Sequence, residues 1–304
     1  MEFCDEREFE QKLVLLLKRH SLKELRSWNY IPGGIHMNVC LENTQGSKYF
    51  LKIPRWQNLS HSEFEVYQFL SLNTKLPVAK PICYDNTLDI FLKPYFVVEY
   101  LEGKSCDFEY DISYQMGKFL RLLHDETEQV VDKWPCPSYE NWREYLLLLA
   151  EKNLALCKPF IDVKNWTITK HIIESSAQLI PEFPKTVLLH RDFKSQNVLL
   201  SCNSDICAIV DFEWAHLGDS LFDLASTESY LSKAQYNVLS GYFSNKKFDF
   251  CEKLYCLYNL INLVHVMGRA TYVLDSPFYF VMMKIPYLRK LLCRWSEIYD
   301  ESNI

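Results

Sequence analysis

Residues 187–225, VLLHRDFKSQNVLLSCNSDICAIVDFEWAHLGDSLFDLA, decide the fold of this chain. Short apolar runs alternate with polar loops along the stretch, which ends in a loop rich in acids. The runs Val198–Leu200 and Ile206–Val210 flank a turn-forming segment, Asn203–Asp205, so the pattern predicts a β-hairpin. The run Val187–Leu189 predicts a strand that leads into the loop before this hairpin.

The polar residues of this stretch have the spacing of a phosphoryl-transfer site. Asp192 follows His190 and Arg191, Asn197 comes five residues after Asp192, and Asp211 comes fourteen residues after Asn197. Phosphoryl transfer needs a carboxylate at the acceptor hydroxyl and hard oxygen ligands for the metal on the phosphates. A single HxD, or one Asp after a strand, is often only a turn or a helix cap. The joint spacing within one strand–loop–hairpin unit therefore predicts a kinase catalytic core.

The composition is that of an ordinary globular protein. The chain has 304 residues, of which 48% are hydrophobic and 24% charged, and no apolar run approaches the roughly 18 residues of a spanning helix. The acidic start, MEFCDEREFEQKL, has no apolar core of a signal peptide. Eleven cysteines without a CxxC pair favour free thiols in a reducing, cytoplasmic compartment. The net charge of −6 argues against nucleic acid and suits a cationic small molecule.

The first part of the chain has the pattern of a nucleotide lid. Residues 5–25 predict an amphipathic helix. Three β-type runs follow, Leu25–Ile31, Met37–Glu42 and Lys48–Ile53. Gly33 and Gly34 separate the first two runs, and glycines allow backbone amides to approach phosphate oxygens. The same pair could also be a simple turn.

Lys52 lies in an otherwise apolar run, FLKIP. Such a lysine is either an edge residue that reaches solvent or a functional residue with a carboxylate partner. The segment 60–72 predicts a helix that offers Glu63 and Glu65. Glu63 is the preferred partner, because it is seven residues from Leu70 and so shares the packed face. Alternatively, both acids are ordinary first-turn residues favoured by the helix dipole.

The run Tyr95–Gly103 predicts a buried strand that ends in acids and a glycine. This pattern suits a hinge between two lobes whose backbone binds adenine, although a plain core strand would look the same. Most of the chain after Gly103 has helical periodicity, including residues 114–124, 141–150 and 233–304.

Five further polar residues receive no catalytic role. Asp223 is predicted to cap a helix. Asp219 is predicted to brace the loop HRDFKSQN, residues 190–197, which is called the catalytic loop for its predicted role, or to lie in a surface turn. His265 and Arg269 share a helix face and are interpreted as structural, and His124 is given no catalytic role.

The segments GGIHMN, YFLKIP, VVEYLEG, HRDFKSQN and VDFEWAHLGDSLFDLA, together with Glu63, resemble the aminoglycoside phosphotransferase and choline kinase superfamily. Its members are small-molecule kinases with a protein-kinase-like, two-lobed α+β fold. The resemblance implies a nucleotide-binding lobe over residues 1–101, with a small antiparallel sheet and one main helix. It implies a larger, mostly helical lobe for catalysis and acceptor binding over residues 102–304.

The resemblance also implies roles for individual residues. Asp192 would orient or deprotonate the acceptor hydroxyl, and Asn197 and Asp211 would bind Mg²⁺. Lys52 would hold the phosphates of ATP (or GTP), and Glu63 would pair with Lys52.

Five further positions complete the implied nucleotide site. Gly33 and Gly34 would cover the phosphates, and backbone groups of Glu99 and Leu101 would meet adenine. Lys194 lies where serine/threonine protein kinases have a phosphate-contacting lysine.

The HRDFKSQN loop makes a protein kinase the rival interpretation. However, DFE replaces DFG, no APE follows, and only a few residues separate Asp211 from Gly218. This leaves no room for the activation loop that presents a peptide.

The predicted function is phosphorylation of a small-molecule hydroxyl with ATP or GTP and Mg²⁺. The resemblance ranks an aminoglycoside-type antibiotic first among acceptors. Choline, ethanolamine and sugars are alternatives, because aromatic residues can hold a quaternary ammonium group. An inactive nucleotide-binding scaffold is a last alternative, although the residues whose loss it would predict are all present.

Overall fold

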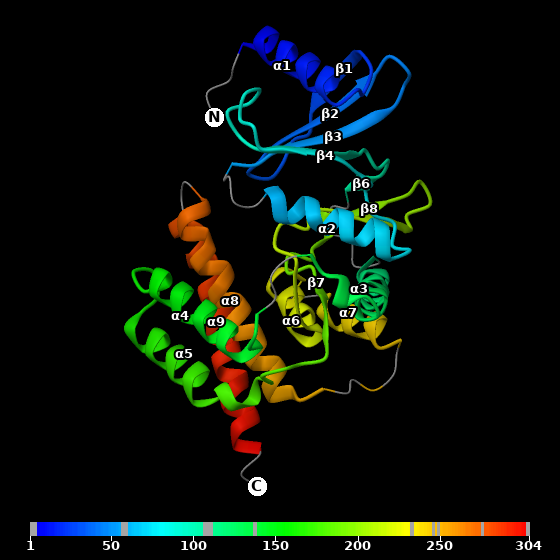
Figure 1. Cartoon of the computed structure of the whole chain (residues 1–304). Helices are drawn as coiled ribbons and strands as arrows, with labels where there is room; N and C mark the ends of the chain where they lie inside the picture. Colours follow the sequence, from blue (N-terminus) through cyan, green and yellow to red (C-terminus); the bar gives the residue numbers. More distant parts are fainter. Residues whose placement is uncertain are drawn as a thin grey trace. The chain divides into compact units, whose positions relative to one another are not determined.

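The computed structural model describes residues 5–55, 60–105, 112–135, 139–231, 234–244, 247, 250–274 and 277–301. The chain forms two compact units. The N-terminal unit comprises residues 1–106, 133–136 and 197–214, and the helical unit comprises residues 107–132, 137–196 and 215–304. Figure 1 shows the elements of each. The predicted division between residues 101 and 102 stays a prediction.

A five-stranded antiparallel sheet forms the base of the N-terminal unit, in the order β1-β2-β3-β5-β4. Its strands are β1 (Leu25–Tyr30), β2 (Met37–Asn43), β3 (Lys48–Ile53), β4 (Pro81–Asp85) and β5 (Tyr95–Glu99). The turn between β2 and β3 is fixed by the Asn43 side chain, whose Oδ1 accepts from the N–H groups of Gln45 and Ser47. The three strands predicted in this region are confirmed.

Helix α1 (Glu6–Arg19) covers part of this sheet with one apolar face. Asp5 caps it by accepting a hydrogen bond from the N–H of Arg7. The buried face consists of Phe9, Leu13, Leu16 and Leu17. The predicted helix is confirmed but is shorter than residues 5–25, because Ser21 and Lys23 adopt positive φ before β1 begins.

Helix α2 (Ser60–Asn73), the predicted main helix, packs against β4 and β5 in the same unit. A second, three-stranded sheet has the order β6-β8-β9, with β6 (Lys104–Ser105), β8 (Val198–Leu200) and β9 (Ile206–Ile209). The predicted hairpin is therefore confirmed, with Val198 opposite Ile209.

The helical unit contains seven α-helices within the described residues. They are α3 (Ser113–Glu128), α4 (Trp142–Cys157), α5 (Val163–Ser175), α6 (Ser220–Leu231), α7 (Gln235–Tyr242), α8 (Glu252–Val273) and α9 (Pro277–Glu301). Short 3₁₀ turns lie at η3 (Val131–Lys133), η4 (Ala177–Leu179) and η5 (Ser195–Asn197). None of the described helices combines the length and the apolar character that crossing a membrane requires.

Helix α8 is the centre of the helical unit and packs against α4, α6 and α9 (Figure 1). Close approach depends on small residues, since a Cβ at Gly268 would lie 2.5 Å from the Oδ1 of Asn153 in α4. A two-stranded sheet pairs β7 (Thr186–Leu189) with β10 (His216–Asp219) and leads into the catalytic loop. The antiparallel sheet followed by helices confirms the predicted α+β class.

Candidate active site

Lys52 of the N-terminal unit is a buried cation held by carboxylates. It lies in β3, between Asn38 of β2 and Phe96 of β5, and only 3% of the residue is exposed. Its Nζ is 2.6 Å from Oε2 of Glu63 and 2.8 Å from Oδ1 of Asp211. The predicted ion pair between Lys52 and Glu63 is therefore present, and the nucleotide-binding role of the two residues stays a prediction.

The cluster around Lys52 carries more acids than bases. A third carboxylate, that of Glu213, lies 3.8 Å from the Lys52 ammonium. Burial lowers the pKa of Lys52, but Asp211, Glu63 and Glu213 outweigh burial and hold this pKa well above its usual value. Burial raises the pKa of Glu63, and the neighbouring Asp211 adds to this rise against the attraction of Lys52. An added cation would relieve the excess of negative charge.

His36 connects the loop after Gly33 and Gly34 to the segment after β9 that contains Asp211 and Glu213. Its Nδ1 accepts from the N–H of Arg55 at 3.0 Å, so the proton is assigned to Nε2, which donates to Glu213 at 2.6 Å. Both the His36 and the Glu213 side chains are 5% exposed. This pair was not predicted from the sequence, although GGIH contains the histidine and DFE contains the acid.

Asn197 and Asp211, the predicted metal ligands, lie at one end of the β8–β9 hairpin. The N–H of Val210 donates to the Asn197 carbonyl at 3.0 Å, directly after the pairing of β8 with β9. Asp211 has a φ of 67°, and its N–H donates to the hydroxyl of Tyr67. Its side chain is 34% exposed, so a carboxylate oxygen can receive a ligand.

These oxygen donors fit Mg²⁺, which usually binds one or two protein carboxylates together with phosphates and water. Among the residues that the structure describes, no group of three or more His, Cys, Asp or Glu is placed to hold a metal ion. A magnesium ion at Asn197 and Asp211 would therefore take its other ligands from a nucleotide and from water.

The predicted glycine and hinge positions differ in whether their backbone groups are accessible to a ligand. Gly33 and Gly34 have φ values of 103° and 74°, and a Cβ at Gly33 would meet no atom within 4 Å. The N–H of Glu99 donates to the Lys80 carbonyl at 2.8 Å, so this amide is already used. The amide of Leu101 has no partner within the described part of the chain. The adenine-binding role of Glu99 and Leu101 stays a prediction.

Asp192 in the helical unit is buried and flanked by cations. The Nζ of Lys194 lies 2.6 Å from its Oδ2, and the Nη2 of Arg269 lies 3.8 Å from its Oδ1. Phe193, between Asp192 and Lys194, is fully buried and anchors the loop. Arg269, interpreted from the sequence as structural, therefore stands beside the predicted catalytic carboxylate.

Asp223 holds the backbone of the catalytic loop. Its carboxylate accepts from the N–H groups of His190 and Arg191, both at 2.8 Å. It also lies 3.2 Å from Nε2 of His124, whose Nδ1 is 2.8 Å from the hydroxyl of Tyr242. These bonds stabilise the positive φ of 62° at Arg191, which is uncommon for a residue with a side chain.

The structure corrects the roles predicted for the two acids after Asp211. Asp223 does not cap a helix, because α6 already begins at Ser220. The carboxylate of Asp223 instead accepts a hydrogen bond from the catalytic loop. Asp219 accepts instead from the N–H of Leu221 at 3.0 Å and from the hydroxyl of Tyr258 at 2.9 Å. The capping contact therefore belongs to Asp219 and the bracing contact to Asp223. His124, which had no predicted role, is part of the bracing network.

The Arg191 side chain turns toward aromatic rings. Its Nη1 donates to the hydroxyl of Tyr145, and its Cζ lies 5.7 Å from the Tyr145 ring centre and 5.6 Å from that of Phe222. Tyr139 and His216 stack with Tyr145. The guanidinium therefore occupies the position over these rings that an external cation would need.

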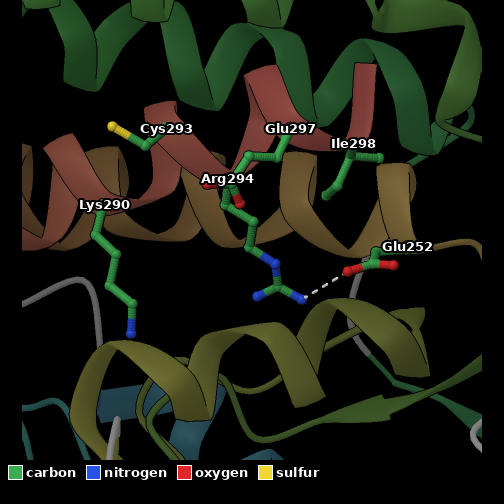
Figure 2. Close-up of a pocket in the computed structure, with 6 residues that line it drawn as sticks. All are labelled: Glu252, Lys290, Cys293, Arg294, Glu297 and Ile298. Carbon is green, nitrogen blue, oxygen red and sulfur yellow. Dashed lines mark hydrogen bonds and ion pairs between the residues drawn. The ribbon is translucent and has the colours of Figure 1, made fainter. Parts of the chain in front are cut away.

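A surface pocket lies elsewhere in the helical unit, along α8 and α9. It is lined by Glu252, Lys290, Cys293, Arg294, Glu297 and Ile298. Figure 2 shows Arg294 directed toward Glu252, with which it forms an ion pair at 3.2 Å. No residue of the catalytic loop lines this pocket.

Comparison with known proteins identifies the class of enzyme. The family model described as the phosphotransferase enzyme family matches residues 27–243, and the chain belongs to this family. It is therefore a phosphotransferase. No curated protein matches the chain.

Solved structures of aminoglycoside phosphotransferases share the fold. A putative aminoglycoside phosphotransferase from Ralstonia eutropha has a TM-score of 0.69 at 13% identity, covering 94% of this chain and 98% of its own. A thermostable mutant of APH(4)-Ia, in a ternary complex with ADP and hygromycin B, has a TM-score of 0.73 at 14% identity, with coverages of 91% and 96%. The GDP and kanamycin complex of APH(2")-IIIa has a TM-score of 0.70 at 15% identity, with coverages of 93% and 99%.

Proposed function

We propose that this phosphotransferase moves the γ-phosphoryl group of ATP or GTP to a hydroxyl of a small molecule. The observation that carries the proposal is the buried Lys52, held 2.6 Å from Glu63 and 2.8 Å from Asp211. A fixed lysine beside a partly exposed carboxylate that could bind Mg²⁺ is what nucleotide phosphates require. The similar structures with ADP or GDP support a nucleotide donor, and they leave the choice between ATP and GTP to experiment.

The residues divide the work of an in-line displacement. Asp192 would orient the acceptor hydroxyl and receive its proton, while the acceptor oxygen forms a bond to the γ-phosphorus. The bond from the γ-phosphorus to the bridging oxygen breaks, which releases ADP or GDP. Lys52 and Lys194 would balance charge on the phosphates. Asn197 and Asp211 would hold Mg²⁺, which supplies further charge neutralisation when it is bound.

The acceptor class is proposed from family resemblance and from the charges near Asp192. Family resemblance ranks an aminoglycoside-type antibiotic first, with choline, ethanolamine and sugars behind it. Two observations count against cationic acceptors in this ranking. Lys194 and Arg269 flank Asp192, so a polycation would meet like charges there. Arg191 already fills the aromatic cluster at Tyr145.

The same proposal places the protein in the cytoplasm. All eight cysteines that the structure describes are free thiols, which suits a reducing compartment.

The test is release of ADP or GDP with Mg²⁺ over a panel of hydroxyl compounds, including kanamycin, choline, ethanolamine and glucose. Product mass should show one added phosphoryl group. Asp192→Asn should lower kcat by about 10²–10⁴-fold, since it removes the proton-accepting carboxylate. Labelling of a generic basic protein, dependent on Asp192, would instead indicate a protein kinase. Nucleotide binding without transfer to any acceptor would favour the scaffold alternative.

A further inference from the structure

The loop between β1 and β2, residues 31–36, is closed at its base and open at its tip. The N–H of Ile31 donates to the Asn38 carbonyl at 2.9 Å, which closes the base. Gly33 and Gly34 at the tip are exposed. A Cβ at Gly33 would meet no atom within 4 Å, and one at Gly34 would lie 3.9 Å from Nδ2 of Asn38. A loop with so few contacts at its tip keeps one position only if it is anchored elsewhere.

The His36 side chain provides such an anchor at the end of the loop. Unlike the two glycines, this side chain is buried. Its Nε2 donates to Oε2 of Glu213 at 2.6 Å, and its Nδ1 accepts from the N–H of Arg55 at 3.0 Å. The ring therefore connects the loop to the segment after β3 and to the segment after β9.

Glu213 links His36 to the cluster around Lys52. The Oε2 atom that accepts from His36 also lies 3.8 Å from Nζ of Lys52. The same ammonium donates to Asp211 at 2.8 Å. All four residues belong to the N-terminal unit. A continuous chain of polar contacts thus runs from the glycine loop to the predicted metal ligand.

Stability alone does not explain the pair of His36 and Glu213. Glu213 is 8% exposed, and its Oε1 has no hydrogen-bond partner within the described residues. Burying an acceptor without a donor is unfavourable. A buried ion pair also adds little net stability compared with apolar side chains of similar size. Positioning of the glycine loop therefore accounts for the pair better than stability does.

We infer that His36 is a positioning residue, which acts through Glu213 to hold residues 31–36 against the phosphates of the bound nucleotide. The inference rests on the proposed function. Gly33 and Gly34 have φ values of 103° and 74°, and glycines in such conformations can direct backbone N–H groups at an anion. Fixing the loop in advance removes part of the entropy cost of ordering it on binding. The contribution of His36 is therefore specific to ligands that carry phosphates.

The experiment compares nucleotides with nucleosides in the full-length protein with Mg²⁺. Isothermal titration calorimetry gives Kd for ADP against adenosine and for GDP against guanosine. The main variant is His36→Asn, because its Oδ1 can still accept from the N–H of Arg55 while its amide is too short to reach Glu213. The Kd for the nucleotide should rise about 10-fold, the value of one hydrogen bond to a charged group, and that for the nucleoside should stay within about 2-fold.

Three further variants test the route through Glu213. His36→Gln places an amide donor nearer to Glu213 and should restore most of the lost affinity. His36→Asn should have no additional effect in a Glu213→Leu background, because the contact is already absent there. The matched control is His20→Asn. His20 is another histidine of the N-terminal unit, with its Nε2 3.0 Å from the hydroxyl of Tyr95, and its substitution should leave nucleotide binding unchanged.

Steady-state kinetics add a second readout on any acceptor that the wild-type enzyme phosphorylates. His36→Asn should raise the KM for the nucleotide by about 10-fold, while kcat and the KM for the acceptor stay within about 2-fold. A histidine that only supports the fold would not separate these constants.

Four results would overturn the inference. They are an unchanged nucleotide Kd in His36→Asn, equal losses for nucleotide and nucleoside, additive losses when His36→Asn is combined with Glu213→Leu, and an equal loss in His20→Asn. In each case, phosphoryl transfer by the wild-type protein keeps the proposed function. A wild-type protein that binds neither ADP nor GDP and transfers no phosphoryl group would reject the proposed function and the inference together.

Discussion

Two buried charge clusters, one in each unit, are built in opposite ways. Around Lys52, three carboxylates share one cation, and that of Asp211 is partly exposed. Around Asp223, one fully buried carboxylate receives two backbone N–H groups and the ring of His124. The Lys52 cluster therefore carries unbalanced negative charge, whereas the buried Asp223 carboxylate is hydrogen-bonded within the protein; the second is called the complete cluster below.

This difference separates the groups that meet ligands from the groups that hold the chain. A complete buried network gains most of its stability within the protein and fixes the backbone of the catalytic loop. A cluster with excess charge is less stable alone and gains from bound metal and nucleotide. Substitutions in the two clusters should therefore affect different measurements.

The largest effect on stability should come from Asp223→Ala. It removes the acceptor for the N–H groups of His190 and Arg191 and leaves them buried, at a cost of about 3–5 kcal/mol in the free energy of unfolding. Urea unfolding followed by circular dichroism measures this cost. A loss below about 1 kcal/mol would contradict the bracing role, because that is the size expected for a surface acid.

Asp211→Asn should have the opposite effect, with a large loss of kcat and a small change in the free energy of unfolding. Removing the negative charge should lower kcat by about 10²–10³-fold, while unfolding changes by no more than about 1 kcal/mol. Asn tolerates the positive φ of 67° at this position, so the backbone need not move. Steady-state kinetics over a range of Mg²⁺ and urea unfolding of the same sample test both parts. Full activity would remove Asp211 from the metal site.

The complete cluster around Asp223 should also make the free energy of unfolding depend on pH in the acid range. Burial raises the pKa of Asp223, but bonds from His124 and His190 outweigh burial and lower it below its usual value of 3.8. Its contribution to the free energy of unfolding is therefore present above about pH 4 and is lost as the pH falls through the folded-state pKa. Unfolding between pH 2 and 6 measures the slope, which should be shallower in Asp223→Asn. An NMR titration of the carboxyl carbon should show the lowered pKa directly.

A matched pair of tyrosines gives the smallest and sharpest test. Tyr67→Phe removes the acceptor for the N–H of Asp211, and Tyr242→Phe removes the hydroxyl beside His124. Each should cost about 1 kcal/mol in unfolding, the value of one hydrogen bond. Only Tyr67→Phe should also lower kcat, because it loosens Asp211, the predicted metal ligand. Equal kinetic effects of the two substitutions would contradict the division between the clusters.

Local patterns predicted much of this arrangement. Alternating apolar runs predicted the β8–β9 hairpin, and the helical period predicted the buried face of α1. The seven-residue spacing of Glu63 and Leu70 selected the correct partner for Lys52, because that spacing places two residues on one helix face.

Contacts between distant parts of the chain could not be predicted in this way. His36 and Glu213 are separated by 177 positions, and no local pattern records that the loop after β1 meets the segment after β9. Asp219 and Asp223 are four residues apart and equally suited to capping. Their roles depend on where β10 ends and on the position of His124, which only the folded chain defines.

The path of the chain also limits how such an enzyme can be assembled by recombination. The N-terminal unit takes residues 197–214 from late in the sequence, and these residues supply the partners of Lys52 and His36. A single genetic crossover near residue 101 would pair Lys52 and His36 of one parent with Asp211 and Glu213 of another. Parents that differ at these positions would give mismatched charges in the buried cluster. A recombinant joined near residue 101 keeps the cluster intact only if a second crossover restores residues 197–214 of the first parent.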